Sequence, residues 1–84
     1  MTRVEVYATS YCWYCRQAKA LLGRKGVEYE SIDATDPARR REAIERSGRR
    51  TVPQIFIGGR SIGGYDDLRA LEDSGELDAL LEGG

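Results

Sequence analysis

Hydrophobic and polar positions change their period along the first half of the chain, and each change predicts a different element. Residues 3–8 alternate, with Val4 and Val6 on one face, which is typical of a β-strand. Residues 13–25 repeat apolar positions at helical spacing until a glycine ends the pattern. Residues 27–32 are predicted as a second strand. A strand, a helix and a strand in this order favour a right-handed crossover between parallel strands.

The middle of the chain carries local signals for a helix and a hairpin. Asp36-Pro37 combines a capping side chain with proline at the first helical position. A helix is therefore predicted over residues 37–47, with Ala43 and Ile44 as its main anchors. Two strands, over residues 54–57 and 60–62, follow it. They are joined by two glycines, which is a strong hairpin signal.

The C-terminal stretch is predicted to be helical. Gly63-Gly64 ends the fourth strand, and Asp66 and Asp67 follow where acidic side chains suit the positive end of a helix dipole. Ser74-Gly75 is expected to split this stretch into two short helices. The leucines available for burial against a sheet are Leu68, Leu71, Leu77, Leu80 and Leu81.

The order of elements predicts an α/β fold with one four-stranded mixed sheet and helices on both faces. The 84 residues suit a single domain spanning residues 1–84. The longest apolar runs are too short to span a bilayer, so no membrane association is expected. Arg3 and Glu5 interrupt the N-terminus, which argues against a secretory signal and favours the cytoplasm.

Charge is spread unevenly although the net charge is −1. Cations dominate residues 1–64 and acids dominate residues 65–84. Between Ala8 and Val27 the chain has four cations and no acid. One interpretation is a solvated helix face. The other is a positive field around a thiolate and an anionic substrate. Nucleic-acid binding is disfavoured, because the chain is acidic overall and its aromatic residues are not interleaved with the cations.

The only two cysteines, Cys12 and Cys15, stand where the first strand gives way to the first helix. Cys12 is expected at the helix N-cap, where unpaired backbone N–H groups and the helix dipole favour a negative sulfur. Arg16 and Lys19 add positive charge. Cys15 lies one turn further on the same side and is expected to be more buried. This arrangement predicts thiol–disulfide exchange, with Cys12 as the nucleophile and Cys15 as the resolving thiol.

Two other interpretations of the cysteine pair are weaker. A structural zinc site needs four ligands, and the chain has no histidine and no third cysteine, so no metal is expected there. Two inert buried cysteines are the remaining alternative. The placement of the pair between a strand and a helix, in a chain with this order of elements, argues against that alternative.

Two remote motifs are candidates for substrate binding. Thr51-Val52-Pro53 precedes the third strand, and proline there is commonly a turn residue. A cis bond before Pro53 would instead turn the Val52 backbone toward the cysteines, where it pairs with a peptide-like substrate. Residues 63–67 form a turn and helix cap, and the same features offer an anion site next to a carboxylate.

With these motifs in this order, the chain resembles the glutaredoxins, specifically the small bacterial type with two active-site cysteines. The resemblance covers nearly all 84 residues. It rests on Cys12-Trp13-Tyr14-Cys15, on Thr51-Val52-Pro53, on residues 54–57, and on Gly63-Gly64 followed by two aspartates. It implies a thioredoxin fold with strand order 2-1-3-4, and a monomer that reduces protein disulfides and glutathione mixed disulfides at the expense of glutathione.

The resemblance also implies roles for individual residues. The family's first cysteine takes glutathione from a mixed disulfide or attacks a protein disulfide, and that role falls on Cys12. Cys15 completes the dithiol reaction. The glutathione site then comprises Tyr14, Thr51, Val52, Pro53, Gly64, Asp66 and Asp67. The implied partners are glutathione and proteins that carry disulfides or glutathionylated cysteines.

The chain departs from the family's usual pattern at two positions near Cys12. Trp13 replaces a proline, and Thr9 replaces a lysine that would pair with a carboxylate. Arg39, Arg40 or Arg41 is a candidate replacement for that lysine. Relatives without the proline can hold a [2Fe–2S] cluster between two chains, each supplying one cysteine, with two glutathiones as further ligands. That function, and reduction by thioredoxin reductase instead of glutathione, stay open as alternatives.

Overall fold

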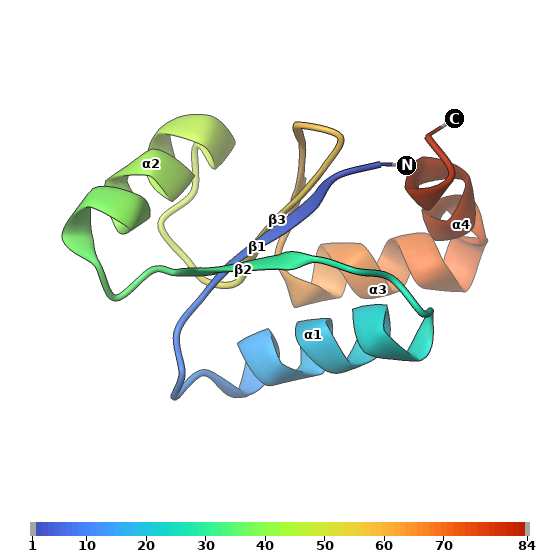
Figure 1. Ribbon diagram of the computed structural model, residues 1–84, viewed down its shortest axis with the longest axis horizontal. Helices are drawn as coiled ribbons and strands as arrows, with labels where there is room; N and C mark the ends of the chain where they lie inside the picture. The colour runs from blue at the N-terminus through green and yellow to red at the C-terminus, as the bar shows by residue number, and fades with distance from the viewer. Residues whose placement is uncertain (1, 84) are drawn as a thin grey trace.

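The computed structural model describes residues 2–83, which form a four-stranded sheet covered by helices. The elements, in chain order, are β1 (Val4–Ala8), α1 (Trp13–Arg24), β2 (Glu30–Asp33), α2 (Pro37–Ser47), β3 (Gln54–Ile57), β4 (Arg60–Gly63), α3 (Tyr65–Ser74) and α4 (Glu76–Leu81). The strand order is β2-β1-β3-β4, with β1 and β2 parallel and the other pairs antiparallel. The predicted mixed sheet of order 2-1-3-4 is therefore confirmed. Figure 1 shows α2 on one side of the sheet and α1 and α3 on the other.

The best-predicted helix is α2, because its ends are set by local chemistry. The Ala38 N–H donates to Asp36 Oδ1 at 3.0 Å, which satisfies one of the helix's free N–H groups. Gly48 ends the helix in the left-handed conformation, with φ of +75°. The predicted break at residues 74–75 is also confirmed, since Gly75 adopts φ of +82° between α3 and α4.

Both faces of the sheet are buried. The larger core lies on the α1 and α3 side and consists of Val4, Val6, Ala8, Cys15, Ala18, Leu21, Leu22, Ile55, Ile57, Leu68 and Leu77. The smaller core lies on the α2 side and consists of Tyr7, Ile32, Ala34, Ala43 and Phe56. Val4 and Val6 share one face as predicted, and every residue of β1 is buried because helices cover both of its faces.

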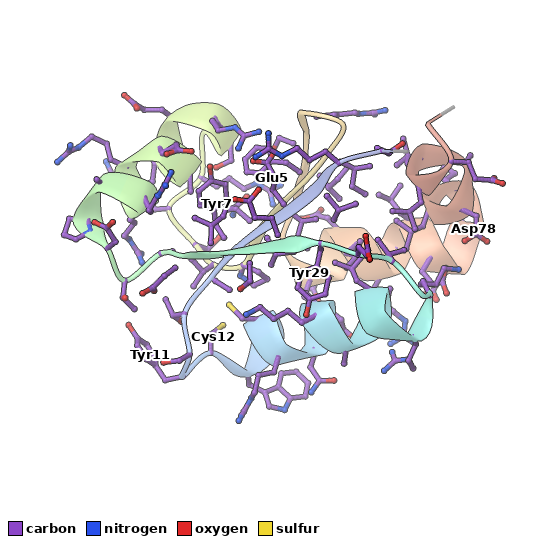
Figure 2. All side chains as sticks on the ribbon, in the orientation of Figure 1. Glu5, Tyr7, Tyr11, Cys12, Tyr29 and Asp78 are labelled. Atoms are coloured by element: carbon purple, nitrogen blue, oxygen red, sulfur yellow. The ribbon has the colours of Figure 1, made fainter. Side chains whose placement is uncertain are left out.

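The smaller core is closed by a charged group. The Arg46 guanidinium makes two hydrogen bonds to the Glu5 carboxylate, at 3.1 and 3.0 Å, and lies 4.0 Å from the centre of the Phe56 ring. Glu5 and Tyr7 lie on the α2 side of β1 (Figure 2). Ile44, expected as an anchor of α2, is only partly buried. Arg46 takes that anchoring place, because its long side chain reaches the sheet.

The second strand was predicted too early in the chain. Pairing with β1 runs from Glu5 opposite Glu30 to Ala8 opposite Asp33, so β2 spans Glu30–Asp33 instead of residues 27–32. Val27 and Tyr29 pack against the larger core without joining the sheet. No helix within residues 2–83 is long and apolar enough to cross a membrane.

Candidate active site

Cys12 is the N-cap of α1, in the connection that follows β1 (Figure 2). Its backbone is extended, and its Sγ accepts a hydrogen bond from the Cys15 N–H at 3.2 Å. The first turn of α1 contains no acidic residue. A thiolate at this position therefore meets a backbone donor and the positive end of a helix dipole, without a nearby carboxylate in its own helix turn.

Cys15 has a different environment one turn further along α1. Its side chain is 1% exposed and belongs to the larger core, whereas Cys12 is partly exposed. Burial, together with the neighbouring Cys12 side chain, raises the pKa of the Cys15 thiol to about 11. Both cysteines are free thiols. The prediction that Cys15 is the more buried member of the pair is confirmed.

The turn before β3 brings its backbone to the nucleophile. Cys12 Sγ lies 3.8 Å from the Val52 carbonyl oxygen, and the Val52–Pro53 peptide bond is cis, which agrees with the second of the two interpretations of Pro53. The turn is held from within by Gln54, whose side chain is fully buried. Gln54 Nε2 donates to the Thr51 carbonyl at 2.9 Å and to Thr51 Oγ1 at 3.2 Å.

The start of α3 forms the third part of the site. The Gly64 N–H donates to Asp67 Oδ2 at 2.9 Å, and Arg49 donates to the same oxygen at 2.8 Å. These two donors hold the pKa of the Asp67 carboxyl below its usual range. A Cβ added at Gly64 would lie 3.5 Å from the Pro53 carbonyl oxygen, so this helix start adjoins the turn before β3. Asp66 is exposed at the same helix start.

Aromatic rings connect the first helix to the third. The Tyr14 ring lies 6.3 Å from the Tyr65 ring and 5.2 Å from the Trp13 ring, measured between centroids. Tyr11, Trp13 and Tyr14 are the exposed large hydrophobic side chains within residues 2–83. The rim around Cys12 is therefore unusually aromatic for a solvent-exposed surface.

Comparison with known proteins gives this arrangement a family. The family model of glutaredoxin matches residues 4–62, which is more than half of the chain. Glutaredoxin 3 of Escherichia coli strain K12 is 52% identical over 83 residues, covering 98% of this chain and 100% of that protein. The chain belongs to the glutaredoxin family.

Solved glutaredoxins share the whole fold as well as the sequence pattern. The solution structure of glutaredoxin from Brucella melitensis is 57% identical, with a TM-score of 0.86, and the match covers 96% of this chain and 89% of that one. The crystal structure of a buckwheat glutaredoxin–glutathione complex is 32% identical, with a TM-score of 0.89 over 96% of this chain and 77% of that one. The thioredoxin fold is thereby confirmed, and membership of the family implies thiol–disulfide oxidoreductase activity.

The structure brings together residues from all three glutaredoxin motifs. Cys12 meets the turn before β3 through Val52, that turn meets the start of α3 at Gly64, and Tyr14 faces Tyr65 across the helices. Sequence reasoning missed Gln54 and Arg49. A polar residue at the start of an apolar strand was the available signal for Gln54, whereas nothing distinguishes Arg49 from the chain's other arginines.

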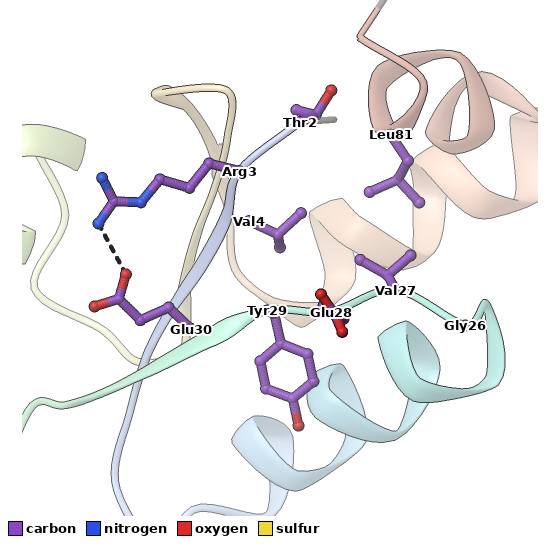
Figure 3. A pocket seen from close by; sticks show the side chains of 9 residues that line it. All are labelled: Thr2, Arg3, Val4, Gly26, Val27, Glu28, Tyr29, Glu30 and Leu81. Carbon is purple, nitrogen blue, oxygen red and sulfur yellow. Dashed lines mark hydrogen bonds and ion pairs between the residues drawn. The ribbon is translucent and has the colours of Figure 1, made fainter.

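One cleft in the structure lies apart from the cysteine pair. A cleft of about 820 Å³ lies between the start of β1, the segment that joins α1 to β2, and Leu81 of α4 (Figure 3). Neither Cys12 nor any other residue of the predicted glutathione site lines this cleft. No group of three or more His, Cys, Asp or Glu side chains in residues 2–83 is placed to hold a metal ion.

Proposed function

We propose that the protein is a glutathione-dependent thiol–disulfide oxidoreductase that reduces protein disulfides and glutathione mixed disulfides. The asymmetry of the two thiols carries this proposal. Cys12 is partly exposed and has a backbone donor at 3.2 Å, while Cys15 is buried and its pKa is raised to about 11. One accessible thiol with a donor, next to one shielded thiol, suits an attack followed by resolution.

The glutathione mixed disulfide reaction uses Cys12 alone. The Cys12 thiolate attacks the glutathione sulfur of a glutathionylated protein, and the protein thiolate leaves and takes up a proton. Cys12 now carries glutathione through a disulfide bond. A second glutathione thiolate attacks this bond, which releases oxidised glutathione and restores the Cys12 thiolate. In the net reaction one glutathione thiol is oxidised and one protein sulfur is reduced to a thiol, so one disulfide, oxidised glutathione, replaces another.

The protein disulfide reaction also needs Cys15. Cys12 attacks one sulfur of the substrate disulfide and frees the first substrate thiol. Cys15 then loses its proton, attacks Cys12 Sγ and frees the second substrate thiol, leaving a Cys12–Cys15 disulfide that two glutathiones reduce. The neighbouring Cys12 side chain helps to raise the pKa of Cys15 in the dithiol. Because a disulfide sulfur has no charge, capture of the substrate by Cys12 removes that influence and favours the Cys15 thiolate.

The glutathione site is proposed to comprise Tyr14, Thr51, Val52, Pro53, Gly64, Asp66 and Asp67. The Val52 backbone lies next to Cys12 Sγ, where the cysteinyl part of glutathione must bind. Asp67 already accepts hydrogen bonds from Gly64 and Arg49. Asp66 is exposed, so it is the carboxylate more available to the glutathione ammonium group. The buckwheat glutaredoxin of 32% identity was crystallised as a complex with glutathione, which supports the proposal of a glutathione site in this fold.

Arg40 is proposed to replace the lysine that the family often has at Thr9. Its Nη2 donates to the Arg50 carbonyl at 2.9 Å, which holds the guanidinium beside the segment leading to Thr51. Arg39 instead pairs with Glu42 at 3.1 Å. We therefore expect Arg40→Ala to raise the KM for glutathione more than Arg39→Ala does.

The experiment that tests the function compares two electron donors. Reduction of a single glutathionylated peptide is followed once with glutathione, glutathione reductase and NADPH, and once with thioredoxin reductase and NADPH. The proposal requires turnover with glutathione. Turnover with thioredoxin reductase alone would instead support a glutaredoxin-shaped protein with a different donor.

Binding of a [2Fe–2S] cluster remains the second prediction. Each chain of a dimer would supply Cys12, which is partly exposed, and two glutathiones would supply the other ligands. Anaerobic reconstitution with iron, sulfide and glutathione tests it by absorbance and molecular mass. A coloured dimer would support the cluster, and a colourless monomer would refute it.

For the redox enzyme we propose a cytoplasmic monomer in which residues 1–84 form one domain.

A further inference from the structure

The side chain of Trp13 has no part in the chemistry proposed above. It follows the nucleophile directly, it is 54% exposed, and it packs edge-on against Tyr14 without joining either core. Tyr11, on the other side of Cys12, is 79% exposed. Single exposed apolar residues are ordinary, but a group of them around a reactive atom is typical of an interaction surface.

Arg16 supplies a charge next to this aromatic surface. It lies one turn after Trp13 on α1, and residues three apart on a helix are neighbours on its surface. Arg16 is exposed and makes no ion pair with any residue between positions 2 and 83. The absence of acids from Ala8 to Val27 leaves its charge uncompensated in sequence as well.

We propose that Trp13 and Arg16 select among disulfide-containing and glutathionylated substrates, favouring peptide segments with an aromatic side chain and a carboxylate near the reacting cysteine. This inference rests on the proposed function, because the surface acts only on substrates that reach Cys12. The aromatic side chain packs on Trp13, and the carboxylate pairs with Arg16.

The spacing of the two groups on the substrate follows from geometry. Side chains three apart on a helix have Cβ atoms roughly 5–6 Å apart. In an extended peptide, residues two apart point to the same side and lie about 6.6 Å apart. An aromatic residue and an acid separated by one residue therefore match Trp13 and Arg16. Glutathione contains no aromatic group, so this recognition concerns the protein part of the substrate.

Four glutathionylated peptides test the proposal. They share one sequence except at two positions near the cysteine, which carry Phe or Ala and Asp or Lys in all combinations. The value of kcat/KM with glutathione as reductant is measured for each peptide and for the mixed disulfide of glutathione and cysteamine. The cysteamine substrate has no flanking residues, so dividing by its value isolates recognition of the peptide from the chemistry at Cys12.

The wild-type protein is expected to prefer the Phe–Asp peptide. Trp13→Ala should reduce the preference for Phe over Ala by roughly three- to tenfold, the usual range for an aromatic pair, and Trp13→Phe should keep most of it. Arg16→Glu should reverse the preference for Asp over Lys. Arg24→Glu is the matched control, because it makes the same charge change on an exposed residue near the other end of α1 and should leave the preference intact.

Two results would overturn the proposal while leaving the function in place. One is equal turnover of all four peptides by the wild-type protein. The other is a Trp13→Ala or Arg16→Glu variant that changes all five substrates by the same factor, which would mean that these residues only shape the site or bind glutathione. Failure of the wild-type protein on every substrate, the cysteamine disulfide included, would instead refute the proposed function.

Discussion

The ionisation of Cys15 gives a quantitative test of the two-thiol account. Burial and the neighbouring Cys12 raise the pKa of Cys15 to about 11. At pH 8 about one molecule in a thousand then carries the Cys15 thiolate, against roughly a quarter for a free cysteine with a pKa of about 8.5. Ionisation alone therefore slows the reaction of Cys15 by about 200-fold relative to a free cysteine.

A second effect opposes this slowing. A thiolate becomes more nucleophilic as its pKa rises, with a Brønsted slope of about 0.4–0.5, and the difference of roughly 2.5 pKa units therefore returns about tenfold in rate. The net expectation is that Cys15 reacts about twenty-fold more slowly than a free cysteine at pH 8. Its 1% exposure slows it further. The loss of thiolate therefore outweighs the gain in nucleophilicity up to about pH 9.5.

Alkylation by iodoacetamide, read separately for each cysteine by mass spectrometry, measures this rate. For Cys15 in the reduced protein, the rate should rise about tenfold per pH unit between pH 7 and pH 10 without reaching a plateau. In Cys12→Ser the influence of the neighbouring thiol is gone while burial remains, so the pKa of Cys15 should fall below 11 and stay above 8.5. A plateau near pH 8.5 in the wild-type protein would refute the reasoning.

Three further substitutions test what holds the site together. Arg46→Met should lower the free energy of unfolding, measured in urea, by about 2 kcal/mol. Breaking a fully buried ion pair typically costs about 3–5 kcal/mol, and the cost is smaller here because the Arg46 side chain is 29% exposed. Because Arg46 lowers the pKa of Glu5, this stabilisation is present above the unfolded pKa of about 4.3 and is lost as the pH falls through the folded value, so variant and wild type should converge in acid. Gly63→Ala should destabilise by about 1–3 kcal/mol and raise the KM for glutathione, since Gly63 has φ of +113° and a Cβ there would overlap the carboxylate that caps α3. Gln54→Leu should lower kcat/KM several-fold, because it removes the two hydrogen bonds that hold Thr51. It should leave the urea midpoint nearly unchanged, because it also removes a buried carbonyl oxygen that has no partner among the described residues. A large loss of stability with unchanged kcat/KM would contradict this role.

Elements with local signals were predicted most closely from the sequence. The helix from Pro37 to Ser47 has the predicted bounds because its cap, its proline and its terminal glycine act within a few residues. The strand after α1 was misplaced because its pairing partner defines it. Glu30 lies opposite Glu5, and no property of residues 27–29 reveals that register. The pattern of apolar residues indicates which segments are extended, but it does not show at which residue the pairing with a parallel strand begins.

The features of the active site divide in the same way, into those set by local sequence and those set by tertiary contacts. The spacing of Cys12 and Cys15, the capping position and the expected difference in burial were all available from one short stretch of sequence. The partners of Asp67 and Thr51 were not, because Arg49 and Gln54 reach them only once the helices and the sheet have assembled. The buried state of Glu5 was missed for a related reason, since it depends on α2 covering the second face of the sheet.

The most direct test of the central claim compares the two serine variants on one small glutathione mixed disulfide, with glutathione as the reductant. If Cys12 attacks and Cys15 only resolves, Cys15→Ser should retain turnover of this substrate and lose the reduction of protein disulfides, because the first reaction never uses the second thiol. Cys12→Ser should reduce kcat/KM to the uncatalysed level. Full activity of Cys12→Ser on the mixed disulfide would contradict the assignment of Cys12 as the nucleophile.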